Sequence, residues 1–183
     1  MSKPSRVIIL LEDARQEQLA RRYLKKRGLR AHDIRFERSP TGRGSAEGWV
    51  RERYSTAVSA YRNRQAKALT ALIVLIDADT ETVKRRMKQL DQALKDSGKQ
   101  PVDPNLEDIA RLVPKRNVET WILCLNEQTV DEKTDYKGTK ENWGELIPQA
   151  AETLSQWRSG SEMFERCIDS LRTGVSELKR LKF

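Results

Sequence analysis

Three stretches of the chain are runs of apolar side chains with almost no polar residue among them. Residues 6–11 read RVIILL, residues 68–76 read ALTALIVLI, and residues 109–113 form a shorter run closed by Pro114. Unbroken runs of this length are typical of strands buried on both faces, as in a parallel sheet. A shorter strand is predicted at residues 33–37, and a loop rich in glycine and serine follows it.

Apolar residues recur with helical spacing between these runs. In the first such segment, Leu19, Tyr23 and Leu24 share one face, and a glycine follows the last turn. The same pattern predicts helices at residues 14–27, 49–65, 80–95, 118–125, 141–157 and 162–181. Strands that alternate with helices favour a mostly parallel central sheet flanked by helices. We therefore predict an α/β fold, with one domain over residues 1–140 and a C-terminal helical extension over residues 141–183 that packs on it.

The composition excludes several classes of protein. The chain has 183 residues, 37% of them hydrophobic and 34% charged, which suits one globular domain, and no apolar run approaches the length of a membrane span. The first residues lack the layout of a signal peptide, so we expect a cytoplasmic protein. Cys124, Cys167 and His32 are the only cysteines and the only histidine, which argues against a zinc site and against a Ser–His–Asp triad.

The positive charge of the chain is concentrated in one stretch. Residues 21–67 hold 14 basic and four acidic side chains, a net charge of +10, so the remainder carries −2 against a total of +8. A basic stretch of this size is typical of a protein that binds a polyanion, most simply nucleic acid. The alternative, from charge alone, is a solvated helix face.

Acidic residues follow two of the predicted strands. Glu12 and Asp13 come directly after RVIILL, and Asp77 and Asp79 form a D-x-D pair after the strongest strand. The carboxyl ends of parallel strands meet at one edge of the sheet, where ligands gather. Carboxylates brought together there need a cation, and an all-oxygen site suits Mg²⁺ or Mn²⁺. The alternative is that these acids cap the following helices, which would suit Asp79 in particular.

This arrangement resembles the TOPRIM fold of primases, topoisomerases and OLD-type nucleases, in which a glutamate follows the first strand and a D-x-D pair follows a later one. Further features are similar to the small RloB-like and OLD-like TOPRIM nucleases of bacterial defence systems. They are the Arg43-Gly44-Ser45 loop, Val113-Pro114 followed by Asn117, Glu119 and Trp121, and Tyr136-Lys137 within TDYKG. Together these features cover roughly residues 6–140.

The chain departs from the TOPRIM pattern at two positions. Asp13 stands where many TOPRIM proteins have glycine after the glutamate. The acid that usually comes four residues after that glutamate is replaced by Gln16, with Glu17 beside it. The ligand set of a second metal ion is therefore the least defined part of the resemblance.

The resemblance implies a nuclease that uses Mg²⁺ or Mn²⁺ to hydrolyse phosphodiester bonds in DNA or RNA. It implies Glu12, Asp77 and Asp79 as metal ligands, with Glu17 placed to reach a second metal ion. Glu119 would face the same pocket, or would serve only as an acid favoured at a helix start. Lys137, in TDYKG, matches the lysine-bearing segment of these nucleases. It would stabilise the developing charge on the phosphate or protonate the leaving group. An exposed loop lysine is the alternative for that position.

The glycine-rich loop and the helix after it are the expected nucleic-acid surface. Backbone N–H groups of such a loop, together with an arginine, can bind a phosphate. A flexible connection in which Ser45 caps the next helix is the alternative, and the spacing excludes a Walker motif. The residues expected to follow the nucleic-acid backbone without reading its sequence are Arg43, Ser45, Arg51, Arg53, Arg62 and Arg64.

Two other functions remain open. The first strand and helix also resemble those of response-regulator receiver domains, in which Asp77 would accept a phosphoryl group and Glu12 and Asp13 would bind Mg²⁺. A TOPRIM-like body that binds nucleic acid or a partner without catalysis is the third possibility. Proteins of this family often act as toxic effectors in anti-phage defence together with an ABC-type ATPase. Since no ATP-binding motif is present here, that ATPase would be a separate chain.

Overall fold

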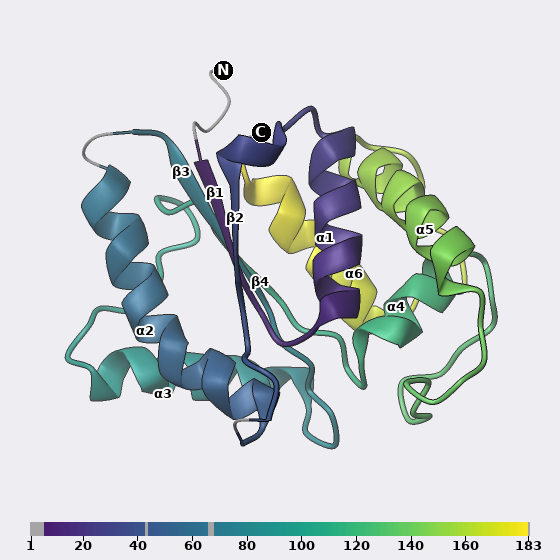
Figure 1. The fold of residues 1–183 in the computed structure, drawn as a ribbon, viewed down its shortest axis with the longest axis horizontal. Coiled ribbons are helices and arrows are strands. Elements are labelled where there is room, and N and C mark those ends of the chain that lie inside the picture. Colours follow the sequence, from purple (N-terminus) through teal and green to yellow (C-terminus); the bar gives the residue numbers. More distant parts are fainter. Residues whose placement is uncertain (1–5, 43, 66–67, 183) are drawn as a thin grey trace.

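The computed structural model describes residues 6–42, 44–65 and 68–182, and its centre is a sheet of four parallel strands (Figure 1). The strands are β1 (Arg6–Leu11), β2 (Ile34–Arg38), β3 (Thr70–Leu75) and β4 (Ile109–Leu112). Their order across the sheet is β2-β1-β3-β4, and each neighbouring pair is parallel. The prediction of an α/β fold with a parallel central sheet is therefore confirmed.

Six α-helices cover the two faces of this sheet. They are α1 (Ala14–Lys26), α2 (Ala46–Gln65), α3 (Val83–Asp96), α4 (Val118–Leu125), α5 (Trp143–Arg158) and α6 (Asp169–Arg180). Figure 1 shows α2 and α3 on one side of the strands and α1, α4, α5 and α6 on the other. Among the described residues, no helix is both long and apolar enough to traverse a lipid bilayer.

Each central strand contributes to both hydrophobic cores. Val7 and Ile9 of β1 lie in the core under α1, α4, α5 and α6, whereas Ile8 and Leu10 lie in the core under α2 and α3. Because side chains alternate between the faces of a strand, only a strand buried on both faces is apolar at every position. Helices α5 and α6 share the first of these cores, so the C-terminal segment completes one face of the sheet.

The last helix is shorter than its periodicity indicated. We predicted a helix over residues 162–181, but α6 begins only at Asp169. The guanidinium of Arg172 donates hydrogen bonds to the carbonyl oxygens of Phe164 (3.2 Å) and Cys167 (3.0 Å). A side chain of α6 thus satisfies backbone acceptors that a continuous helix would satisfy itself, and the chain before α6 follows an irregular path.

Close packing of α6 on α4 depends on Gly174. A Cβ atom at that position would lie 2.3 Å from the ring of Trp121, which is buried and donates a hydrogen bond to Ser170 Oγ (2.8 Å). We expect Gly174→Ala to lower the free energy of unfolding by about 1–3 kcal/mol through overpacking. In a helix, a change from glycine to alanine normally raises the free energy of unfolding, so the effect expected at Gly174 has the opposite sign. Urea unfolding measures it, with Gly138→Ala, which meets no atom within 4 Å, as control. Equal stability of Gly174→Ala and the unmodified protein would contradict this packing.

Candidate functional site

The predicted acidic residues lie at the topological switch point of the sheet, between β1 and β3. β1 and β3 are neighbours, but β1 leads into α1 on one face and β3 leads into α3 on the other. In open α/β sheets, ligands bind outside the carboxyl ends of the strands at such a switch point. Leu11 and Leu75, the last residues of the two strands, are paired in register. Glu12 and Asp77 therefore leave the sheet side by side.

Glu12 and Asp77 form a buried polar cluster with Gln16. The Glu12 carboxylate accepts a hydrogen bond from the backbone N–H of Asp77. Gln16 links the two segments, because its Nε2 donates to Asp77 Oδ1 (3.0 Å) and its Oε1 accepts from the Glu12 N–H (2.8 Å). Asp77 and Gln16 have no exposed surface, and Glu12 is 6% exposed. The sequence analysis noted Gln16 only as a departure from a pattern, and its position four residues after Glu12 was the available signal.

Lys137 brings a positive charge to this cluster. Its Nζ lies 3.3 Å from Asp77 Oδ2 and 3.8 Å from Asp79 Oδ1. The loop that carries it is tied to the start of α4, since Asp135 Oδ1 accepts both the Lys137 N–H (2.9 Å) and Asn117 Nδ2 (2.8 Å). Asn117 is fully buried and caps α4. The segment that follows β4 thus positions Lys137, although this lysine lies further along the chain.

The ionisation of this cluster reflects its burial. Burial raises the pKa of Glu12 to about 7, and the charge of Asp79 adds to that shift. Burial also raises the pKa of Asp77 well above its usual value, with Glu12 as the next cause. Burial alone would lower the pKa of Lys137, but Asp77 and Asp79 outweigh it and raise the pKa. The lysine therefore stays protonated at neutral pH, while the two buried carboxyl groups compete for few compensating charges.

Asp79 is held in a turn that points it out of the sheet. Its φ angle is 54°, in the left-handed region, where non-glycine residues are uncommon and often mark functional sites. Arg86, buried on α3, holds this turn by donating to the carbonyl oxygens of Asp77 (3.0 Å) and Ala78 (3.3 Å). The cap of α3 is Thr82, not Asp79. The Asp79 side chain is 41% exposed and lies 3.8 Å from both Lys137 Nζ and Arg86 Nη2.

Two of the other acids have structural partners. Asp13 caps α1, since its side chain accepts the N–H groups of Arg15 and Gln16 (both 2.9 Å). The carboxylate of Glu17 pairs with Arg21 (2.6 Å) and with Arg38 of β2 (3.0 Å). The structure thus draws Glu17 toward β2, whereas Glu12, Asp77 and Asp79 lie together.

Glu119 lies at the start of α4 and faces α1. It is 2% exposed, and its carboxylate forms an ion pair with Arg15. The Arg15 guanidinium in turn lies over the ring of Trp143, 4.4 Å from the ring centroid. Glu119, Arg15, Trp143 and Lys137 line the same cleft beside the acids, so the structure brings Glu119 into this pocket.

The predicted nucleic-acid residues divide into two groups. Arg51 pairs with Glu47 (2.7 Å) near the start of α2, and Arg53 pairs with Glu37 of β2 (3.5 Å). Ser45 Oγ accepts the N–H of Gly48 (3.3 Å) and so caps α2, as in the alternative interpretation of the loop. Arg43 lies outside the described residues.

The other two predicted arginines lie at the opposite end of the sheet. Arg62 pairs with Glu107 (2.7 Å) and donates to the carbonyl oxygen of Gln100 (3.1 Å), in the loop that leads into β4. Arg64 follows on the same last turn of α2. Because α2 runs the length of the sheet, the structure does not bring these two arginines to the acidic site.

Two clefts open on the acidic cluster from either side of the start of α1. One, of about 500 Å³, is lined by Asp13, Ala14, Arg15, Gln18, Glu119, Lys137 and Trp143. The other, of about 300 Å³, is lined by Glu12, Asp13, Ala14, Arg38, Ser39, Pro40, Thr41, Gly42, Gly44 and Ala46. Asp13 and Ala14 line both clefts, which lie on either side of the start of α1 and are here together named the edge groove.

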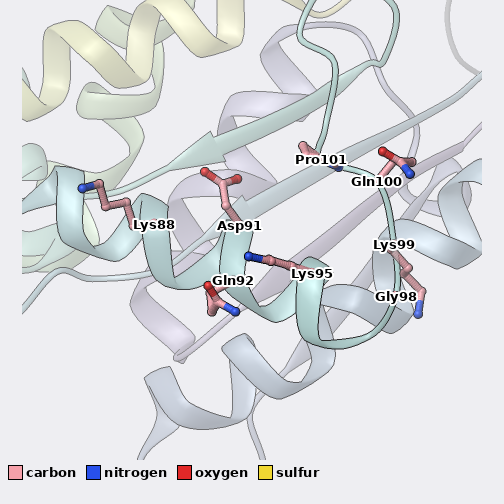
Figure 2. Close-up of a pocket in the computed structure, with 8 residues that line it drawn as sticks. All are labelled: Lys88, Asp91, Gln92, Lys95, Gly98, Lys99, Gln100 and Pro101. Atoms are coloured by element: carbon pink, nitrogen blue, oxygen red, sulfur yellow. The ribbon is translucent and has the colours of Figure 1, made fainter.

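A third hollow, of about 580 Å³, lies between α3 and the loop that follows it (Figure 2). Lys88, Asp91 and Lys95 line it from α3, and Lys99 lines it from the loop. None of its lining side chains is buried, and exposed lysines beside a helix end are common on protein surfaces. The edge groove, which is lined by the buried carboxyl groups of Glu12 and Glu119, is the better candidate for a functional site.

The residues of the edge groove suit a hard cation in atom type and charge. Among the described residues, no three carboxylate, thiol or imidazole groups converge closely enough to enclose a metal ion. Lys137 instead supplies the positive charge between Asp77 and Asp79. Carboxylate oxygens are the ligands that Mg²⁺ and Mn²⁺ prefer, and burial, followed by the neighbouring carboxylates, raises the pKa values of Glu12 and Asp77. In donor chemistry, the site fits a divalent cation.

The raised pKa of Glu12 predicts a pH-dependent loss of stability. The pKa is about 7 in the fold against the usual 4.5, so ionisation of this carboxyl destabilises the fold increasingly as pH rises between these values. We expect Glu12→Gln, which can still accept the Asp77 N–H, to raise the free energy of unfolding by about 1–3 kcal/mol at about pH 8. The gain should largely vanish at about pH 4.5.

Urea unfolding at both pH values measures this effect. The exposed Glu52→Gln on α2 is the matched control and should change stability little at either pH. A gain for Glu12→Gln that is equal at both pH values, or a loss at the higher one, would contradict the electrostatic origin of the shift.

The chain was also compared with known proteins. A scan of protein-family models, a search of curated proteins and a search of solved structures each found no match.

Proposed function

We propose that the protein is a nuclease that uses Mg²⁺ or Mn²⁺ to hydrolyse phosphodiester bonds in DNA or RNA, on a TOPRIM-like fold. The observation that carries this proposal is the cluster of Glu12, Asp77 and Asp79 at the switch point with Lys137 bound to it. Three carboxylates and one lysine at the carboxyl edge of a parallel sheet are a suitable set for metal-assisted phosphoryl chemistry. The resemblance to TOPRIM nucleases rests on the same residues.

Glu12, Asp77 and Asp79 are the residues that would hold the metal. A bound divalent cation would supply a water nucleophile and would neutralise charge on the phosphate. Asp77 comes from the end of β3, where Gln16 and the Glu12 backbone fix its orientation. Asp79 is the most accessible of the three and lies on the turn that Arg86 holds.

Lys137 is the candidate for electrostatic catalysis. Its raised pKa keeps the ammonium charged, so it can stabilise negative charge on the phosphate or give a proton to the leaving oxygen, but it cannot act as a base. The Asn117–Asp135 contact holds its loop in place before substrate arrives. This preorganisation is what such a role requires, because a charge fixed in advance needs no reorganisation during the reaction.

The proposed cellular role follows from the family resemblance alone. RloB-like and OLD-like proteins suggest a toxic effector of anti-phage defence, acting in the cytoplasm with a separate ABC-type ATPase. The chain itself contains no ATP-binding motif. Co-purification with the product of a neighbouring ATPase gene would test this part of the proposal.

A receiver-like phosphoacceptor is the second candidate, and two observations favour it. Receiver domains place a loop lysine beside the acidic residue that accepts the phosphoryl group, and Lys137 is paired with Asp77 here. The strand order also agrees with doubly wound folds of the receiver type. Asp79, however, adds an acid beside Lys137 that receiver domains do not usually need. Labelling of Asp77 by acetyl phosphate would support this candidate, and its absence would remove it.

Cleavage assays test the nuclease directly. With Mn²⁺, the purified protein should degrade plasmid, single-stranded DNA or RNA, and Asp77→Ala should abolish the activity. Lys137→Ala should lower the rate about 10²–10³-fold, as expected for removal of a preorganised electrostatic group. Lys133→Ala, an exposed lysine on the same loop, is the matched control and should keep full activity.

Two outcomes would count against the proposal. Activity that survives in Asp77→Ala would refute the assignment of the metal ligands. Binding of nucleic acid without cleavage, unchanged in Asp79→Ala, would identify a non-catalytic binding module instead.

A further inference from the structure

The cleft beside Lys137 contains an arginine that lies over a tryptophan ring, a pair that the proposed chemistry does not use. Arg15, the second residue of α1, and Trp143, the first residue of α5, both line it. The Arg15 guanidinium lies 4.4 Å from the centroid of the Trp143 ring. The two residues are far apart in the sequence, and the packing of α5 on α1 and α4 brings them together next to the acidic cluster.

The position of the Arg15 guanidinium is fixed on two sides. The face of the Trp143 ring lies on one side, and the buried carboxylate of Glu119 binds Nη1 on another. Trp143 itself packs against the hydrophobic core, so the ring beneath Arg15 is anchored. The Arg15 side chain nevertheless keeps 29% of its surface exposed, toward the cleft. A planar group held in this way loses little further entropy when another planar group stacks on it.

A second basic side chain, Arg38, lines the other part of the edge groove. The two parts of the edge groove meet at Asp13 and Ala14, and Arg38 lies in the part beyond Glu12. A phosphate chain that reaches from Arg38 to Lys137 would therefore pass the start of α1, next to Glu12. Cleft volumes of a few hundred Å³ suit groups the size of a small ligand, such as one nucleotide on either side.

We propose that Arg15, held between Trp143 and Glu119, is a platform on which an unpaired nucleobase stacks, so that the substrate is single-stranded nucleic acid. This inference rests on the proposed function for the phosphate chemistry, but it concerns the base. Unpaired bases stack on aromatic rings and on arginine guanidinium planes, whereas bases inside a duplex are already stacked and paired. Arg38 and Lys137 contact the phosphates, and Arg15 supplies the preference for a single strand.

Binding measured in EDTA tests this proposal without cleavage. Fluorescence anisotropy gives the affinity for a labelled oligo(dA) of about 12 nucleotides, for an abasic strand of the same length and for a blunt duplex. The protein should bind oligo(dA) about tenfold or more tighter than the abasic strand, because stacking adds to the phosphate contacts. The duplex should bind no better than the abasic strand.

Arg15→Lys is the decisive variant, because it keeps the charge and removes the plane. It should lose the preference for oligo(dA) over the abasic strand while it still binds the latter. Arg22→Lys, the same change at an exposed position of α1, is the matched control and should keep the preference. Trp143→Leu removes the ring beneath Arg15 and should act like Arg15→Lys, which guards against a folding defect specific to either variant.

The results separate this inference from the nuclease proposal. Three results would overturn the stacking platform, whether or not the protein cleaves nucleic acid. They are equal affinity for oligo(dA) and the abasic strand, tighter binding of the duplex than of the abasic strand, and a preference for oligo(dA) that persists in Arg15→Lys. If the preference is present and depends on Arg15, but no cleavage occurs with Mn²⁺, the platform stands and the nuclease proposal fails.

Discussion

The burial of the Asp77 carboxyl group is the constraint on which the rest of the site depends. A carboxylate without exposed surface needs hydrogen bonds and a counter-charge, because its loss of hydration is otherwise too costly. Gln16 from α1 supplies the hydrogen bond and Lys137 from a distant loop supplies the charge. Burial and the adjacent Glu12 still raise its pKa. The site is therefore electrostatically unfavourable in the free protein, as is common where a protein binds a charged ligand.

Three separate segments are brought together to satisfy this one group. β1 and β3 end in register, so Glu12 and Asp77 meet directly. Lys137 arrives through a chain of contacts that begins at Asn117, the cap of α4, and passes through Asp135. The fold of the sheet and the loop geometry after β4 are thus coupled through Asp77.

Much of the fold could be predicted from the sequence, because local pattern determines it. The apolar runs at β1 and β3 and the periodicity of α1 and α4 follow from which side chains must be buried. The acids after β1 and β3 could also be placed together, since parallel strands end at one edge. The predicted start of the last helix was wrong: the chain before Asp169 is irregular, and the Arg172 side chain binds its carbonyl groups, which the spacing of apolar residues does not reveal.

The finer contacts of the site could not be predicted for the same reason. Gln16 holds Asp77 through a bond between elements far apart in the chain, and Arg86 binds the carbonyl group of Asp77 from the next helix. The charge count indicated a basic rim, but α2 carries Arg62 and Arg64 to the far end of the sheet. What the sequence showed as one basic stretch is therefore divided in space, and only part of it borders the acids.

The stacking of Arg15 on Trp143 also depends on the packing of α5 against α1, because the two side chains come from opposite ends of the chain. Aromatic residues are few in this sequence, and their low number did not reveal that one of them, Trp143, lies beside Arg15.

The central claim is that Glu12, Asp77 and Asp79 form a site for a divalent cation. Calorimetric titration of the purified protein with Mn²⁺ tests it most directly, because it needs no substrate and no assumption about the reaction. The account predicts saturable binding that is lost in Asp79→Asn and retained in Asp96→Asn, a change at an exposed position of α3. Absence of binding by the unmodified protein, or equal binding by Asp79→Asn, would contradict it.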